Sequence, residues 1–239
     1  MEKFKTGIYQ TFVLNDNYMY FVNGLKITML VALFALLIGL VLGAAISIVR
    51  SAHDQQGEGK KNPVLGFFNI LCQFYLTVIR GTPCMVQLLI MWFVIWASAR
   101  STEKNMIICA ILTFGINSGA YIAEIFRSGI MAVDKGQMEG GRSLGLSYAS
   151  TMKNIIIPQA FKNAIPALGN EMITLVKETS IVTVIGLKDL TKGALIIQGN
   201  TFQALIPFFA IAAIYLSVVL ILSWIMSNIE RRMRKSDQR

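Results

Sequence analysis

Residues 27–49 read ITMLVALFALLIGLVLGAAISIV and contain no charged side chain. A run of about 18 or more uncharged, mostly apolar residues is long enough to cross a bilayer as an α-helix. Further long charge-free stretches include 81–99, 105–123 and 193–229. The sequence therefore predicts an all-α integral membrane protein whose chain crosses the bilayer several times.

The composition supports a membrane protein. Of the 239 residues, 54% are hydrophobic and 15% are charged, and the mean hydropathy is +0.58, whereas about a quarter of the residues in a soluble domain are charged. The formal net charge of +9 comes from basic residues near the ends of the apolar runs, and no soluble region is left to bind nucleic acid. Cys72, Cys84 and Cys109 lie inside apolar segments, which indicates neither a disulfide framework nor a metal cluster.

We expect about five transmembrane helices in one domain, 1–239, at about 20–49, 64–98, 105–130, 163–186 and 204–227. Gly24, Gly39 and Gly43 in the first span would let another helix approach closely. Residues 62–98 would form a helix of about 55 Å, nearly twice the hydrocarbon thickness. This stretch is either a hairpin broken at Gly81–Thr82–Pro83 or one span with an interfacial leader, and we favour the single span.

The distribution of lysine and arginine predicts the orientation, because loops rich in these residues stay in the cytoplasm. With five spans, one side holds 13 basic residues, in loops 50–63 and 127–162 and in the tail after 227, while the other side holds 7. We therefore expect a multi-pass membrane protein with its N-terminus outside and its C-terminus in the cytoplasm. A six-span arrangement would place the N-terminus inside.

The longest polar segment, 127–162, falls on the predicted cytoplasmic side. Asp134 or Ser143 could cap the start of a short helix, and Pro158 marks a helix boundary because it lacks an amide proton. A short helix held at both ends by membrane spans could transmit motion from a cytoplasmic partner. The alternative is an ordinary interfacial loop that only connects two spans.

Within this segment, the order Glu139, Gly140, Gly141, Gly145 and Ile155-x-Ile157-Pro158 resembles the EAA signature of permease subunits of bacterial ABC importers. Several other segments resemble the polar amino acid branch of that family: RGTPCMVQL (80–88), NSGAYIAEIFRSGI (117–130), KGQMEGGRSLGLS (135–147), PQAF (158–161) and PALGNEMITLVKETS (166–180). The resemblance covers about residues 18–230. Gly140 and Gly141 depart from it, since the signature has two alanines there, and each mid-helix glycine costs roughly 1 kcal/mol relative to alanine.

The resemblance implies a type I ABC importer permease, with 134–158 as the cytoplasmic coupling-helix segment. It implies that this segment docks on a separate ABC ATPase subunit that carries ATP and Mg²⁺, while this chain binds no cofactor itself. It also implies a second copy of the permease or a homologous one, an extracytoplasmic amino acid binding protein, and contact with membrane lipid. The residues that would couple to the ATPase are Glu139, Gly140, Gly141, Arg142, Ser143, Leu144 and Gly145.

Polar and ionisable groups inside predicted spans are costly and therefore mark candidate functional sites. Glu171 and Lys177 are six residues apart, on nearly opposite faces of a helix, so they cannot pair within it. The predicted pathway residues, which could hold a zwitterionic amino acid, are Asn117, Ser118, Asn170, Glu171, Lys177 and Thr179. The alternative is a polar network that only stabilises the helix bundle. We expect Arg80, Glu124 and Arg127 to be interfacial structure.

The sequence contains no GxxxxGK[ST] phosphate loop and no catalytic constellation, so we expect a transport subunit rather than an enzyme. Two other functions remain open from the residues alone. An ion-coupled secondary transporter could use Glu171 and Lys177, although such proteins usually contain internal repeats. A scaffold subunit that does not transport would have little need for polar groups inside its spans.

Overall fold

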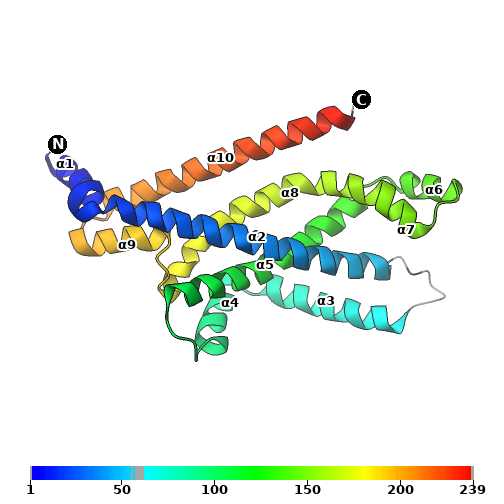
Figure 1. The fold of residues 1–239 in the computed structure, drawn as a ribbon, viewed down its shortest axis with the longest axis horizontal. Helices are drawn as coiled ribbons and strands as arrows, with labels where there is room; N and C mark the ends of the chain where they lie inside the picture. Colours follow the sequence, from blue (N-terminus) through cyan, green and yellow to red (C-terminus); the bar gives the residue numbers. More distant parts are fainter. Residues whose placement is uncertain (1, 55, 57–61, 238–239) are drawn as a thin grey trace. The chain divides into compact units, whose positions relative to one another are not determined.

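The computed structural model describes residues 2–54, 56 and 62–237, which form helices joined by short turns (Figure 1). Within these ranges there is no β-strand, so the all-α prediction is confirmed. The long helices are α2 (Tyr18–Asp54), α3 (Pro63–Gly81), α5 (Glu103–Met131), α8 (Ile157–Glu178) and α10 (Leu205–Asp237). The shorter ones are α1 (Glu2–Ile8), α4 (Cys84–Ile90), α6 (Lys135–Ser143), α7 (Tyr148–Thr151) and α9 (Leu190–Thr201).

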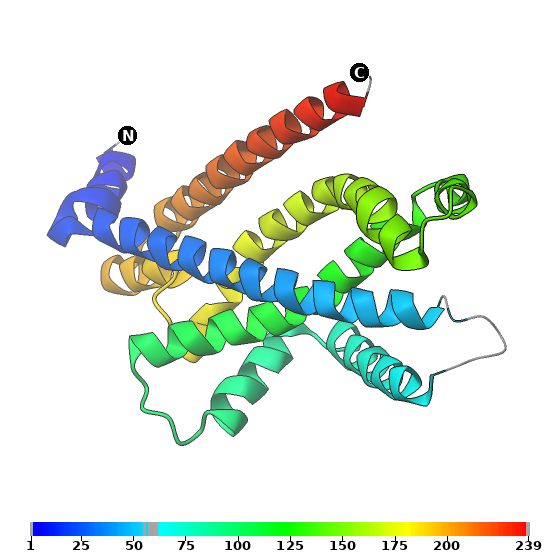
Figure 2. The ribbon, with the colours of Figure 1, turned by 45° about the vertical axis from the view of Figure 1, so that its right-hand side comes forward.

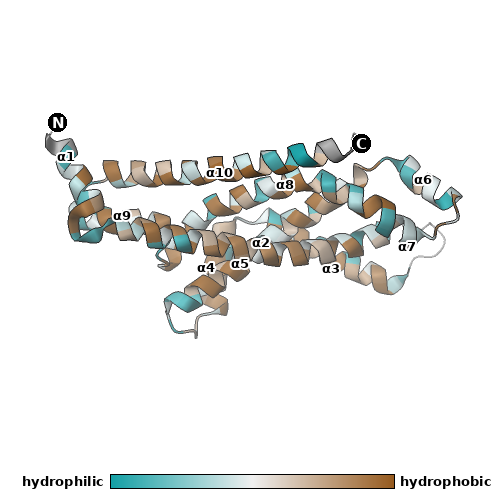
Figure 3. Cartoon of the chain, turned by 45° about the horizontal axis from the view of Figure 1, so that its top comes forward, coloured by the Kyte–Doolittle hydropathy of each residue, from teal (hydrophilic) through white to brown (hydrophobic). Residues whose placement is uncertain are grey.

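Among the described residues, four helices are long and apolar enough to cross a membrane: α2, α3, α5 and the Leu205–Met233 part of α10. Figure 3 shows that α10 is hydrophobic over most of its length and becomes hydrophilic toward its C-terminal end. The predicted span 163–186 corresponds to α8 and the following 3-10 helix, Thr179–Ile185. Its polar residues, Glu171, Lys177 and Glu178 among them, distinguish α8 from these four. The division into five crossings stays a prediction.

The favoured single span over 64–98 is not one continuous helix. Helix α3 begins at Pro63, where the side chain of Asn62 accepts a hydrogen bond from the amide of Val64 at 3.0 Å, and it ends at Gly81. Thr82 has extended backbone angles (φ −122°, ψ 144°) because the ring of Pro83 disfavours helix at the residue before it. Helix α4 then starts at Cys84 and continues as a π-helical turn to Ile95.

The chain divides into two compact units, and α2, α5, α8 and α10 each contribute residues to both. Unit 1 comprises Met1–Leu37, Pro83–Gly115 and Met172–Ser223, and unit 2 comprises Ile38–Thr82, Ile116–Glu171 and Trp224–Arg239. The core of unit 1 contains fully buried side chains from α2, α4, α5 and the end of α8, such as Val31, Leu88, Phe114 and Val176. A second apolar cluster in unit 1 holds α9 in place through Leu190, Ala194 and Ile197.

Glycines in α2 allow close packing in each unit, as the sequence predicts. In unit 1, a Cβ atom on Gly24 would lie 2.7 Å from the carbonyl oxygen of Asp189. In unit 2, a Cβ atom on Gly43 would lie 2.6 Å from Cγ2 of Ile122 in α5, and one on Gly39 would lie 3.0 Å from Cδ1 of Ile122. These positions have no room for a larger side chain, so α2 lies against its neighbours there.

The segment predicted as one coupling helix contains two short helices, α6 and α7, which follow α5 directly (Figure 2). Asp134 caps α6 by accepting a hydrogen bond from the amide of Gly136 at 2.7 Å, as the sequence predicts. Ser143 is the last residue of α6, and Ser147 caps α7 instead, by accepting from the amide of Ser150. The segment therefore contains two capped helix starts, one for α6 and one for the helical stretch that begins with α7.

Gly145 ends α6 in a conformation that suits glycine. Its φ of +83° is left-handed, and its amide donates to the carbonyl of Arg142, while the amide of Leu146 donates to the carbonyl of Gly141. This pair of bonds is the Schellman arrangement, which satisfies carbonyls that the helix end would otherwise leave free. Gly145 therefore sets where α6 stops and the chain turns toward α7.

The two glycines at 140 and 141 have different surroundings. A Cβ atom on Gly140 would have no neighbour within 4 Å. One on Gly141 would lie 2.6 Å from Cγ2 of Thr151 and 3.2 Å from Cδ1 of Ile155, because α6 lies directly on the helix that follows it. The small size of Gly141 is thus required by packing, whereas Gly140 has no such requirement.

The chain stays helical from α7 through a π-helical turn, Met152–Ile156, into α8. Ile157, the residue before Pro158, has helical backbone angles (φ −59°, ψ −43°), so the predicted helix boundary at Pro158 is wrong. Pro166 lies in the interior of α8, where its missing amide proton removes one backbone hydrogen bond. The side chain of Gln159 donates to Gln137 at 3.4 Å, which connects α8 to α6.

Asp189 caps α9 from a fully buried position outside the predicted spans. Its carboxylate accepts hydrogen bonds from the amides of Lys192 at 2.9 Å and Thr191 at 3.1 Å. Burial raises the pKa of Asp189 from 3.8 to about 6, even though these hydrogen bonds favour the charged form. The loss of hydration on burial is the larger effect here.

We predict opposite effects for alanine at the two adjacent glycines. Gly140→Ala should stabilise α6 by up to about 1 kcal/mol, because alanine loses less backbone entropy and meets no neighbour. Gly141→Ala should destabilise the segment by about 1–3 kcal/mol, because Thr151 must move. Amide hydrogen exchange in α6 measures both effects. Exchange should be slower than in wild type for Gly140→Ala and faster for Gly141→Ala. Equal effects in the two variants would contradict the packing described for Gly141.

A second prediction concerns Asp189 and pH. Because its pKa is higher in the folded chain than in the unfolded chain, the folded state binds more protons between pH 3.8 and about 6. The stability that this group contributes is fully present below pH 3.8 and is lost as pH rises through 6, by at most about 3 kcal/mol. Asp189→Asn keeps a capping side chain that does not titrate. Chemical unfolding in lipid nanodiscs at pH 4.5 and 7.5 should therefore show that wild type loses stability relative to Asp189→Asn at the higher pH, and parallel curves would refute this.

Candidate functional site

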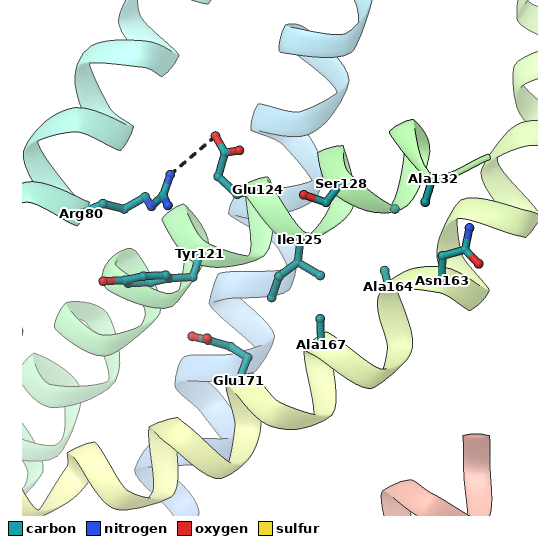
Figure 4. Close-up of a pocket in the computed structure, with 11 residues that line it drawn as sticks. Arg80, Tyr121, Glu124, Ile125, Ser128, Ala132, Asn163, Ala164, Ala167 and Glu171 are labelled. Atoms are coloured by element: carbon teal, nitrogen blue, oxygen red, sulfur yellow. Dashed lines mark ion pairs between the residues drawn. The ribbon is translucent and has the colours of Figure 1, made fainter. Parts of the chain in front are cut away.

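The candidate site is a cavity of about 470 Å³ in unit 2, with walls from α5 and α8 and from the end of α3 (Figure 4). Helices α5 and α8 come close together at its edge, since a Cβ atom on Gly129 of α5 would lie 2.6 Å from the carbonyl oxygen of Ala160 in α8. Its lining residues are Arg80, Tyr121, Glu124, Ile125, Ser128, Gly129, Ala132, Asn163, Ala164, Ala167 and Glu171. The cavity therefore brings side chains of both charge signs together against a mostly small and apolar wall.

Glu124 is the centre of a charge cluster at one side of this cavity. Its Oε1 forms an ion pair with Nη1 of Arg50 from α2, and its Oε2 accepts from Nε of Arg127 at 3.0 Å. Arg80 approaches the same carboxylate, with 3.8 Å between its Nη1 and Oε1 of Glu124. One carboxylate is thus shared by three guanidinium groups, each from a different helix or helical turn.

Arg80 is the guanidinium of this cluster that is most open to the cavity. Its side chain is 45% exposed, compared with 16% for Arg50 and 31% for Arg127. Its guanidinium carbon lies 5.7 Å from the centre of the Tyr121 ring, a distance at which a cation and an aromatic face attract each other. Figure 4 shows Arg80 pointing toward Glu124 alongside Tyr121. Arg80 is therefore positioned to meet an anionic group that enters the cavity.

Glu171 supplies a second carboxylate, from α8. Its Oε1 accepts a hydrogen bond of 2.7 Å from the hydroxyl of Ser118 on α5, and Ser118 is fully buried. Asn117 beside it is also buried, at 4% exposure. The geometry thus joins α5 and α8 through a polar contact at the cavity wall.

The structure brings together part of the predicted pathway set. Ser118 and Glu171 are in direct contact, and Glu171 lines the cavity. Asn170 lies beside Glu171 in the sequence but is exposed and does not line this cavity. Lys177 is exposed and Thr179 is buried, with its hydroxyl bonded to the carbonyl of Val176, and both belong to unit 1.

The predicted coupling residues lie on and just after α6. Glu139 and Arg142 are exposed on the helix, as are Gly140 and Ser143, while Gly141 is buried. Leu144, at the C-terminal end of α6, is 83% exposed. Glu139 lies within α6, so it does not cap the start of the helix. The segment thus presents charged groups and one large apolar side chain on its surface.

The cavity includes two residues that the sequence does not assign to the pathway. Arg80 and Glu124 are expected from the sequence to be interfacial structure, yet both line the cavity together with Glu171. Tyr121, Ser128 and Asn163 also line it. The sequence does contain an indication that Arg80 could lie at a binding site. Arg80 precedes the helix-breaking pair Thr82–Pro83, and binding sites are common where a membrane helix is interrupted.

Known proteins resemble this chain over most of its length. Residues 64–235 match the family described as "Binding-protein-dependent transport system inner membrane component". The arginine transport system permease protein ArtQ of Bacillus subtilis is 37% identical over 91% of this chain and 94% of its own. The glutamine transport system permease protein GlnP of Escherichia coli K12 is 36% identical over 89% of this chain and 92% of its own.

Solved structures agree with these relatives. A crystal structure of an amino acid ABC transporter with histidines matches at 39% identity with a TM-score of 0.79, over 90% of this chain and 94% of that chain. The MetNI methionine ABC transporter in an inward-facing conformation matches at 15% identity with a TM-score of 0.72, over 90% of this chain and 96% of that chain, and shares the fold. The chain therefore belongs to the family of inner membrane components of binding-protein-dependent transport systems.

Proposed function

We propose that this chain is the membrane-spanning subunit of an ATP-driven importer and that a polar amino acid passes through the cavity of Figure 4. The observation that carries the proposal is the presence of Arg80, Glu124 and Glu171 in one cavity of about 470 Å³. Ligand cavities typically measure about 300–1,000 Å³. Relatives named for arginine and glutamine transport support the substrate class.

The charges of the cavity suit a zwitterion. Arg80 is the open guanidinium and would attract the α-carboxylate, and Glu171 would attract a cationic group of the substrate. Glu124 is already engaged by Arg50 and Arg127 and would hold Arg80 in place. The carboxylate of Glu171 favours a cationic amino acid over an acidic one, because it would repel an acidic side chain.

The energy would come from partner subunits. An ABC ATPase that holds ATP and Mg²⁺ would bind the surface formed by Glu139, Arg142 and Leu144 on α6. A second permease, identical or homologous, would complete the pathway, and an extracytoplasmic binding protein would deliver the amino acid. With the N-terminus outside and the C-terminus in the cytoplasm, closure of two ATPases would move α6 and switch access to the cavity.

We predict that Glu171→Gln weakens transport of a cationic amino acid. The change keeps the shape of the side chain and removes its charge, and the loss of one charge-assisted contact should lower apparent affinity by about tenfold. Uptake of arginine into proteoliposomes that contain the chain, an ABC ATPase and a binding protein measures this. Glu103→Gln, which removes a carboxylate outside unit 2, is the matched control and should transport normally.

Uptake that continues without ATP and stops when an ion gradient is dissipated would overturn the ATP-driven function. Unchanged arginine affinity in Glu171→Gln, with ATP-driven uptake intact, would overturn only the role of Glu171. The two parts of the proposal are thus tested separately.

We also predict that Gly145→Trp separates ATP hydrolysis from transport. Position 145 needs a left-handed backbone, which costs a bulky L-residue about 1–2 kcal/mol, and a tryptophan there would obstruct the surface beside Leu144. ATPase activity should persist while uptake falls at least about tenfold. Gly199→Trp in α9 is the control, because Gly199 is also exposed and a Cβ atom there would have no neighbour within 4 Å. Normal uptake by Gly145→Trp would count against docking at this segment.

A further inference from the structure

A second cavity, of about 440 Å³, lies on the other side of the Glu124 cluster, also within unit 2. It is lined by Arg50 from α2, Glu124 from α5, and Gln73, Leu76, Thr77 and Arg80 from α3. Arg80 and Glu124 border both cavities, whereas Arg50 lines only the second. The proposed transport function makes no use of this second cavity.

The charges around the second cavity are unbalanced. Glu124 carries one negative charge and pairs with Arg50, Arg80 and Arg127, so these four side chains together keep two positive charges. Glu171 lines the first cavity and accepts a hydrogen bond from Ser118. A guanidinium is a fork of hydrogen-bond donors that matches the oxygens of a phosphate or carboxylate. The surplus positive charge therefore favours an anionic ligand.

One polar atom of a cavity-lining side chain has no partner within the chain. Among the described residues, Nε of Arg50 is buried and has no hydrogen-bond acceptor. A buried polar group without a partner is costly, and in native proteins nearly all of them are satisfied by protein, water or ligand.

The outer face of α3 beside this cavity is apolar. Ile70 is 65% exposed, Phe74 is 68% exposed and Val78 is 41% exposed, and α3 is one of the helices long enough to cross a membrane. Figure 3 shows hydrophobic colouring along most of α3. A ligand at this place would meet guanidinium groups at one end and an apolar helix face at the other.

We propose that this cavity binds the phosphate of an anionic phospholipid, with Arg50 as its ligand and with the acyl chains along Phe74 and Ile70. Basic cavities between membrane helices are suited to lipid headgroups. A lipid explains both the surplus charge and the apolar face, whereas a free phosphate ion would leave the apolar face unused. The proposal does not depend on which substrate the first cavity carries.

The experiment measures lipid bound to the full-length chain by native mass spectrometry after reconstitution in nanodiscs. The nanodiscs contain equal amounts of phosphatidylcholine and phosphatidylglycerol. We expect phosphatidylglycerol to remain bound to the protein in preference to phosphatidylcholine. Inorganic phosphate, glycerol phosphate, arginine and glutamine are added as separate competitors. None of them should displace the lipid.

Four variants distinguish a change in lipid binding from a general loss of protein stability. Arg50→Gln removes attraction and should weaken phosphatidylglycerol binding by about tenfold. Glu124→Gln removes the repulsion between a carboxylate and the lipid phosphate and should strengthen phosphatidylglycerol binding. The two variants thus have opposite effects, although both break the ion pair between Arg50 and Glu124. Thr77→Phe should weaken binding by filling the cavity without changing any charge. Arg100→Gln removes a positive charge in unit 1, and we expect no change.

Several results would overturn the proposal. Equal weakening by Arg50→Gln and Glu124→Gln would show that the ion pair only maintains the fold. Displacement by inorganic phosphate or glycerol phosphate would show a free anion site, and displacement by arginine or glutamine would assign the cavity to the transport pathway. Equal retention of phosphatidylglycerol and phosphatidylcholine would also exclude a lipid site in this cavity. That result is expected if a second copy of the chain covers this face.

Discussion

The structure depends on one constraint, which is that a membrane offers no water to satisfy backbone amides and carbonyls. A helix that begins away from water must therefore supply its own partners. Asp189 does so at the buried start of α9. Asn62 and Asp134 cap the starts of α3 and α6 from exposed positions, and the exposed Gly145 satisfies carbonyls at the end of α6.

The second organising feature is the sharing of Glu124 by three arginines, from α2, the end of α3, and α5 itself. A lone charge among packed helices would be costly, and the cluster compensates the carboxylate more than fully. Arg80 remains the most open member and borders both cavities. The same ion pairs therefore hold three helices of unit 2 together and leave positive charge available for ligands.

Much of the fold could be predicted because it follows from local rules. Uninterrupted apolar runs predict α2, α5 and α10, and Asp134 predicts the start of α6, whereas Pro158 lies within continuous helix and marks no boundary. The break at Thr82–Pro83 was only one of two alternatives, because a proline in an apolar run is compatible with both. The grouping of Arg80 and Glu124 with Glu171 could not be predicted, since it depends on which faces of α3, α5 and α8 meet. Sequence spacing within one helix carries no information about that.

Helix α8 gives the structure a mechanical property. It starts beside α6, to which Gln159 links it, and it carries Glu171 in the cavity wall about 21 Å further along its axis. No loop interrupts α8 between these two points, so the helix resists compression along its axis. Pro166 lies between the two ends and removes one backbone hydrogen bond, which makes the helix easier to bend there. A displacement of α6 along this axis would reach the cavity wall almost undiminished, whereas a sideways displacement would be partly absorbed at Pro166.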